Sequence, residues 1–273
     1  MGEFYEPIPC DDFCAFVDKV QELQKDKSRR WVFKGLEKSC WPLKTTLERE
    51  CERFGISGDD VQRREYNMIR EFQRRLHHYE THVPRQENVD EWMALMQHYG
   101  APTRLLDFTY SPFVAAYFAF EKAKSGNVSV WAVDGECIDR AFKSDNCCDQ
   151  RLRDAYEEYA NYRSPRAFCS LFLEDPGEKY VLVVNPFRLN DRLAYQQGLF
   201  LCPASVTAGF MENLGGLFKS SLDSTPVKKF IINVGEKGEH RDEALRDLHS
   251  MNINRLRFSL VWLDLRSPST LGL

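Results

Sequence analysis

The sequence lacks any apolar run long enough to cross a bilayer. Its longest such run, Pro112 to Phe120, is far shorter than the roughly 20 residues that a spanning helix needs. The segment Met1 to Cys14 carries four carboxylates, and it lacks the basic stretch followed by an apolar stretch that marks a secretory signal peptide. We therefore expect a cytoplasmic protein that does not enter a membrane.

Signature motifs of several enzyme classes are missing as well. There is no glycine-rich phosphate loop of the P-loop or dinucleotide-binding type, and no Gly-x-Ser-x-Gly nucleophile turn. These absences argue against a kinase, a P-loop ATPase, a Rossmann dehydrogenase and an α/β-hydrolase.

Cysteine and histidine offer little chemistry. The nine cysteines are irregularly spaced and include no Cys-x-x-Cys pair, so we expect mostly free thiols, with Cys147 and Cys148 in a surface loop. His78 and His82 would share a helix face next to His77, as paired zinc ligands do, but no third ligand is evident nearby. We predict no metal site and no redox role for the vicinal cysteines.

Composition is that of an ordinary globular protein. The 273 residues are 43% hydrophobic and 29% charged, and no Pro-, Gly- or Ser-rich stretch could serve as a linker, so we predict one domain spanning 1–273. The net charge is −4, yet five arginines lie in one helical segment: Arg63, Arg64, Arg70, Arg74 and Arg75. Glutamates interleave with them at pairing distance, which favours a solvated helix face over a nucleic-acid stripe and leaves an acidic partner as the alternative.

Hydrophobic periodicity predicts an α+β fold, a mixed β-sheet with packed helices and a mainly helical N-terminal third. The predicted strands lie at 30–35, 104–108, 127–133, 180–184, 199–202, 229–234 and 260–265. The predicted helices lie at 11–27, 45–54, 59–82, 88–100, 111–124, 189–195 and 240–251, with a short one from 254. Residues 134–166 show the weakest pattern, and we predict a lid, a loop insertion or a partly mobile loop there.

One segment concentrates hydrogen-bonding groups beside aromatic rings. Gln97 to Pro112 brings an imidazole, a phenol, a guanidinium, a carboxylate and two hydroxyls into one helix end, loop and strand. This suits a polar ligand that carries phosphates or ribose hydroxyls. Structural roles are the alternative: Asp107 could pair with Arg104, and Thr109 and Ser111 could cap the next helix.

Two further positions are unusual. Lys34 places a cation at the end of a predicted strand, and Gly35 follows it where the backbone must turn or approach another segment closely. His98 lies at a predicted helix end, where it could cap carbonyl groups or face a ligand.

The stretch Gln97 to Ala119 resembles the signature of the FRG domain, a family named for an aromatic-Arg-Gly motif. Phe33-Lys34-Gly35 stands where that motif is expected, and Arg192 to Phe200 is similar to the downstream Gln-Gly-aromatic element. Leu245 to Asn254, followed by 260–265, resembles the closing helix and strand of the family. At coarse grain the order of these elements is similar to that of ADP-ribosyltransferases, which implies an ADP-ribosyltransferase-like core.

That resemblance implies an NAD-consuming enzyme, with NAD as cofactor and an acceptor that the sequence does not identify. It implies catalytic roles for Asp107, Gln197 and His98. It implies cofactor contacts for Phe33, Lys34, Gly35, Tyr99, Arg104, Thr109, Ser111 and Phe118. Lys34 replaces the arginine of the motif and Gln197 is not a carboxylate, so a non-catalytic nucleotide- or protein-binding module is the alternative.

Overall fold

The computed structural model describes residues 4–76, 78, 83–144, 149–174, 177–186, 191–218, 226–236 and 238–255, without the side chains of Asp191 and Arg192. Seven strands form one mixed sheet in the order β1-β7-β4-β2-β3-β6-β5. Their bounds are β1 Glu6–Cys10, β2 Trp31–Leu36, β3 Leu106–Thr109, β4 Asn127–Asp134, β5 Val181–Val184, β6 Gly198–Pro203 and β7 Val227–Asn233. The β1–β7 pair is parallel and the other pairs are antiparallel. The predicted α+β class is confirmed.

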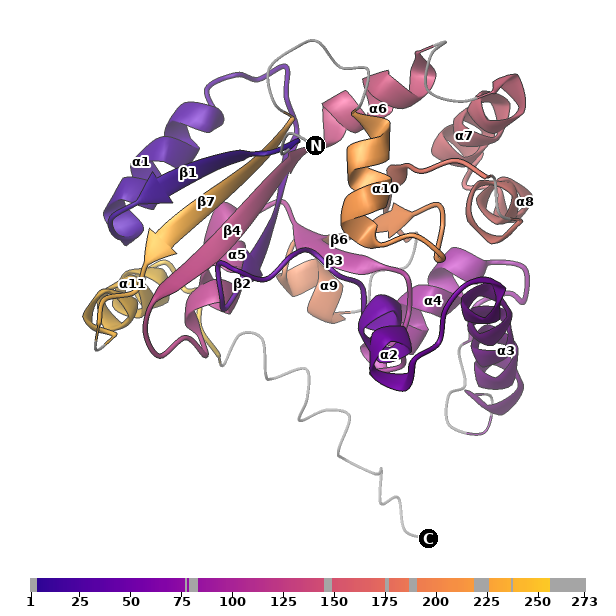
Figure 1. Ribbon diagram of the computed structural model, residues 1–273, viewed down its shortest axis with the longest axis horizontal. Helices are drawn as coiled ribbons and strands as arrows, with labels where there is room; N and C mark the ends of the chain where they lie inside the picture. The colour runs from indigo at the N-terminus through magenta and orange to yellow at the C-terminus, as the bar shows by residue number, and fades with distance from the viewer. Residues whose placement is uncertain are drawn as a thin grey trace, which may run out of the picture.

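Helices cover both faces of this sheet (Figure 1). Their bounds are α1 Phe13–Leu23, α2 Thr46–Phe54, α3 Asp59–Leu76, α4 Val89–His98, α5 Pro112–Phe120, α6 Gly135–Lys143, α7 Gln150–Tyr162, α8 Pro165–Phe168, α9 Asp191–Tyr195, α10 Phe210–Leu217 and α11 Glu239–Ser250, with a π-helical turn at Cys169–Leu173.

Alternating residues of β2, β4 and β7 build two separate cores. Phe33, Val130 and Phe230 face α1, α5 and α11 in one apolar cluster. Val32 and Trp131 belong to the other cluster, which α6, α7, α8 and α10 help to close. This period of two is what a sheet buried on both faces requires. Among the described ranges, we find no helix with the length and apolar content to cross a membrane.

The prediction of a loop at 134–166 was wrong for the part that the structure describes. Asp134 caps α6 by accepting from the backbone N–H groups of Glu136 and Cys137, and Asp149 caps α7 in the same way. Both helices bury apolar side chains at helical spacing, among them Ile138, Phe142, Leu152, Tyr156 and Tyr159. Apart from the buried cap Asp134, the described charged residues of this segment therefore lie on the partly or fully exposed faces of two amphipathic helices and at their ends.

Several other expectations fall outside the described residues. These are the end of the long helix at His77 and His82, the vicinal pair Cys147 and Cys148, and the strand at 260–265. Strand β1 was not predicted, since its Glu-Pro-Ile-Pro-Cys sequence carries two prolines that normally argue against a strand interior. The described cysteines are free thiols, and the described residues contain no group of side chains arranged to hold a metal ion.

Candidate functional site

The sheet opens between β2 and β3. The two strands share a single register pair, Phe33 with Thr109, whereas β2 pairs with β4 over its whole length. Beyond that pair the strands diverge and a cavity of about 220 Å³ lies between them; we call it the fork pocket. Its lining residues are Phe33, Lys34, Gly35, Asp107, Phe108, Thr109, Val114, Ala115, Phe118 and Gln196.

Lys34 bridges the two arms of the fork. Its Nζ donates a hydrogen bond of 3.0 Å to the main-chain carbonyl oxygen of Asp107 on β3. The bond joins strands that no ladder connects at this level, and it fixes an ammonium group in the wall of the pocket. A cation at the end of a strand was predicted from the sequence; in the structure the side chain of Lys34 also reaches from β2 to β3.

Gly35 allows α5 to lie directly against β2. A Cβ atom built on Gly35 would be 1.9 Å from the carbonyl oxygen of Ala115 and 2.9 Å from the amide nitrogen of Ala119. Both neighbours are main-chain atoms of a helix, so no side-chain rotation could make room. The predicted close approach at this glycine is therefore confirmed, and it sets the floor of the fork pocket.

The start of α5 is fixed by two hydroxyl groups. Ser111 caps the helix by accepting from the N–H of Val114, with Pro112 in the first turn. Thr109 donates to the main-chain carbonyl oxygen of Gln196 at 2.6 Å and accepts from the N–H of Ser111 at 3.0 Å. Capping, left open by the sequence, is thus the observed role of Ser111, while Thr109 both lines the pocket and ties β3 to the turn before β6.

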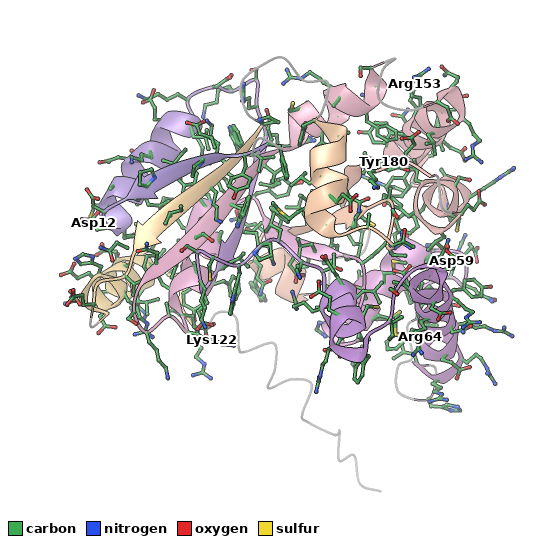
Figure 2. The ribbon with its side chains drawn as sticks, in the orientation of Figure 1. Asp12, Asp59, Arg64, Lys122, Arg153 and Tyr180 are labelled. Carbon is green, nitrogen blue, oxygen red and sulfur yellow. The ribbon has the colours of Figure 1, made fainter. Side chains whose placement is uncertain are left out.

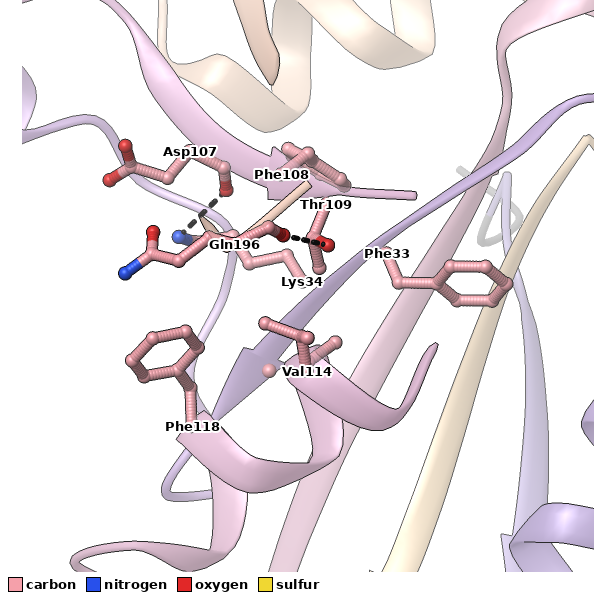
Figure 3. A pocket seen from close by; sticks show the side chains of 10 residues that line it. Phe33, Lys34, Asp107, Phe108, Thr109, Val114, Phe118 and Gln196 are labelled. Carbon is pink, nitrogen blue, oxygen red and sulfur yellow. Dashed lines mark hydrogen bonds between the residues drawn. The ribbon is translucent and has the colours of Figure 1, made fainter. Parts of the chain in front are cut away.

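Four chemically different groups surround the mouth of the fork pocket. Figure 3 shows the carboxylate of Asp107, the ammonium of Lys34, the amide of Gln196 and the ring of Phe118 pointing to the same side. A cation, an anion, an amide and an aromatic face therefore meet at one opening. This set can bind an anionic group, accept and donate hydrogen bonds to an amide, and stack on a planar ring.

The structure places Gln196, rather than Gln197, in the lining. Gln196 is 9% exposed, whereas Gln197 is exposed and has a left-handed φ of 48°. The main-chain oxygen of Gln197 accepts from the N–H of Tyr110 at 3.0 Å. Because the backbone of Gln197 is left-handed, the side chain of Gln196 lines the pocket and that of Gln197 is exposed, and the Gln-Gln sequence alone does not indicate which of the two is inside.

Arg104 does not line the fork pocket and is buried, with 1% of its surface exposed. Its Nε donates to Glu65 on α3 at 2.8 Å, and its Nη1 donates to the carbonyl oxygen of Ala204 at 2.9 Å. Burial by itself would lower the pKa of this guanidinium, but the charge and hydrogen bonds of Glu65 raise it. Arg104 therefore joins α3 to the segment after β6, and it does not pair with Asp107.

His98 and Tyr99 lie at the C-terminal end of α4 and do not line the fork pocket. Their rings contact each other edge to face at 5.4 Å, and Tyr99, 43% exposed, also packs against Phe72. The polar segment from Gln97 to Pro112 therefore does not form one site. His98 and Tyr99 lie at the end of α4, Arg104 joins α3 to the segment after β6, and the residues from Asp107 to Thr109 line the fork pocket.

Residues 29–127 match the family model of the FRG domain. The matched segment spans β2 to the first residue of β4, so it contains both arms of the fork and the whole of α5. The turn that supplies Gln196 lies beyond it. No curated protein and no solved structure matches the chain.

Proposed function

We propose that the fork pocket, nearly all of which lies in the segment that matches the FRG family model, binds the nicotinamide end of NAD and that the protein transfers the ADP-ribose portion to an acceptor. The observation that carries this proposal is the mouth of the pocket, where Lys34, Asp107, Gln196 and Phe118 converge. NAD is the substrate in this account.

The size of the pocket supports a ring-sized fragment. Its volume of about 220 Å³ is below the roughly 300–1,000 Å³ of sites that enclose a whole drug-sized ligand. One ring enters, and the remainder of a dinucleotide stays outside along the mouth. Phe118 offers a face for stacking the ring, and the amide of Gln196 can both donate to and accept from a carboxamide.

Charge at the mouth supports a ligand with a phosphate and a reacting ribose. Lys34 supplies the positive charge that a pyrophosphate or ribose oxygen attracts. Asp107 is the only carboxylate in the described lining. When the bond between the nicotinamide nitrogen and C1′ of the ribose breaks, nicotinamide leaves with the bonding electron pair and positive charge develops on the ribose; a carboxylate nearby stabilises it. The acceptor oxygen then bonds to C1′ and passes its proton to Asp107 or to water.

A non-catalytic nucleotide-binding module is the second candidate, and the same lining favours it. Gln196 cannot act as a base, so Asp107 would have to serve alone. Lys34 also carries a compact ammonium group where the arginine of the family motif would carry a planar guanidinium group with two donors for one ligand group. Binding without turnover is what this candidate predicts.

Calorimetric titration with NAD tests the binding half of the proposal. Lys34→Met keeps the length of the side chain and removes its charge, and we expect affinity to fall about tenfold, the equivalent of about 1.4 kcal/mol. Gln196→Ala should weaken binding by a similar factor. Gln197→Ala is the matched control, because its side chain is exposed and outside the lining, and it should bind like the wild type.

Two results would count against this assignment. If NAD gives no heat and does not raise the melting temperature of the wild type, the fork pocket is not a dinucleotide site. If Gln197→Ala weakens binding as much as Gln196→Ala, the site has been placed on the wrong side of the turn.

A further inference from the structure

An apolar groove separates α2 from α3 on another part of the surface. Its volume is about 400 Å³, and it is lined by Leu47, Cys51, Phe54, Ile56, Met68 and Pro102, with Glu50, Arg64, Asn67 and Glu71 around them. We call it the α2–α3 groove. Its floor belongs to a small apolar cluster that includes Leu47, Cys51 and Val61 and is separate from the two main cores.

The walls of the groove are fixed by hydrogen bonds. Thr103 and Thr46 exchange bonds of 2.9 and 3.0 Å, and the N–H of Leu47 donates to the carbonyl oxygen of Thr103, so the start of α2 is tied to the segment before β3. At the other end, left-handed Gly55 ends α2 and the N–H of Ile56 donates back to Cys51 at 2.9 Å. A groove that is already formed loses little free energy to ordering when it binds.

Phe54 leaves a large apolar surface at the edge of the groove. The side chain is 66% exposed, and its ring is covered only in part by the guanidinium of Arg53 at 5.3 Å. A ring of this size in water beside an apolar floor is the kind of feature that contributes strongly at protein interfaces.

Around this apolar floor arginines outnumber glutamates, although the chain as a whole has a net charge of −4. Glu50, which lines the groove, pairs with Arg53 at 3.7 Å. Glu71 is shared by Arg74 and Arg75, at 2.7 and 3.0 Å, so one arginine of that group is in excess. Arg64 lines the groove and makes no ion pair with any residue that the structure describes. Figure 2 shows Arg64 on the surface where α3 lies beside α2.

We propose that the α2–α3 groove binds a segment of a partner protein that presents bulky apolar side chains flanked by carboxylates. The apolar residues would fill the floor beside Phe54, and the carboxylates would meet Arg64 and the Arg74–Arg75 pair. Pro102 of the groove and Asp107 of the fork pocket are five residues apart, which limits the distance between their Cα atoms to roughly 17 Å. The partner segment therefore lies close to the fork pocket, but its binding does not depend on the activity proposed there.

A displayed library of random 16-residue peptides provides the probe. Selection on the wild type is compared with selection on the double variant Phe54→Ser, Arg64→Glu; both side chains are exposed, so the variant should fold normally. We expect peptides enriched only on the wild type to carry at least two bulky apolar residues at helical spacing and a net negative charge.

Affinities of one such peptide, measured by fluorescence anisotropy, then test each contact. Arg64→Glu should weaken binding about tenfold, and more at low salt than at high salt. The matched control is Arg63→Glu, one position along α3, outside the groove and paired with Asp60; it should change affinity less than about twofold. Phe54→Ser should weaken binding about tenfold or more, since a Phe ring would lose its burial.

Three results would overturn the proposal. Equal enrichment on the wild type and the double variant would show that the groove is not the site, and enriched peptides with a net positive charge would contradict the charge argument. Concentration-dependent dimers in sedimentation that Phe54→Ser abolishes would show that a second copy of this chain fills the groove instead.

Discussion

Replacing Gly35 with alanine should disturb the fold and the fork pocket together. The added methyl group would lie 1.9 Å from the carbonyl oxygen of Ala115, and that oxygen would have to recede by about 1 Å even to reach 3.0 Å, the shortest separation that folded proteins tolerate. The obstacle is the main chain of α5, so the whole helix must move away from β2. Overpacking of a core costs roughly 1–3 kcal/mol, and we expect the upper end of that range here because no side chain can rotate away.

Urea unfolding followed by circular dichroism measures this cost as a fall in the transition midpoint. Gly215→Ala is a suitable control, because the atoms nearest to its methyl group belong to the ring of Phe4, at 3.0 Å or more, and a side chain can shift where a main chain cannot. Within helix α10 the alanine should even recover up to about 1 kcal/mol of helix propensity. Equal midpoints for Gly35→Ala and the wild type would refute the close packing of β2 on α5.

Three further substitutions test other parts of the structure. Arg104→Met should lower the free energy of unfolding by about 3–5 kcal/mol in a urea titration, because it leaves the Glu65 carboxylate buried without its partner, and adding Glu65→Leu should restore most of the loss. Burial raises the pKa of Asp90 above its unfolded value of about 3.9, so its contribution to stability is complete below that pH and is lost as the pH rises through the folded-state pKa. The free energy of unfolding of Asp90→Asn, relative to that of the wild type, should therefore be higher at pH 7 than at pH 4. An equal difference at the two pH values would contradict the raised pKa. Gln197→Gly should leave the free energy of unfolding, measured by thermal unfolding, unchanged or raise it by up to about 1 kcal/mol, because glycine adopts a φ of 48° without strain. A clear loss would show that the side chain is needed.

Local signals in the sequence predicted much of the site. The helix start at Pro112, the cation at Lys34 and the close approach at Gly35 each follow from the chemistry of one residue and its immediate neighbours, whereas capping by Ser111 was only the alternative to a cofactor contact. The order of strands and helices from β2 to β4 also follows, because their periodicity is strong. These features are encoded within a few residues, so no tertiary information is needed to find them.

Other features depend on contacts that a single sequence does not show. Arg104 looked like a ligand-binding residue because it stands in the polar segment, yet its partner Glu65 lies 39 positions earlier. The choice between Gln196 and Gln197 depends on one left-handed residue in a turn. The helices at 134–166 were missed because their charged outer faces outweighed a thin apolar stripe that includes Ile138 and Phe142.

Nicotinamide release is the most direct test of the fork pocket as an NAD-consuming site. Purified wild-type protein and its Asp107→Asn variant are incubated with NAD, with and without cell lysate as a source of acceptors, and free nicotinamide is separated by chromatography. We predict release by the wild type, and a loss of at least about a hundredfold in the variant with NAD binding retained, because asparagine keeps the shape of the side chain and removes its charge. Equal release by both proteins would contradict the role of Asp107, and tight NAD binding without any release would establish a binding module in place of an enzyme.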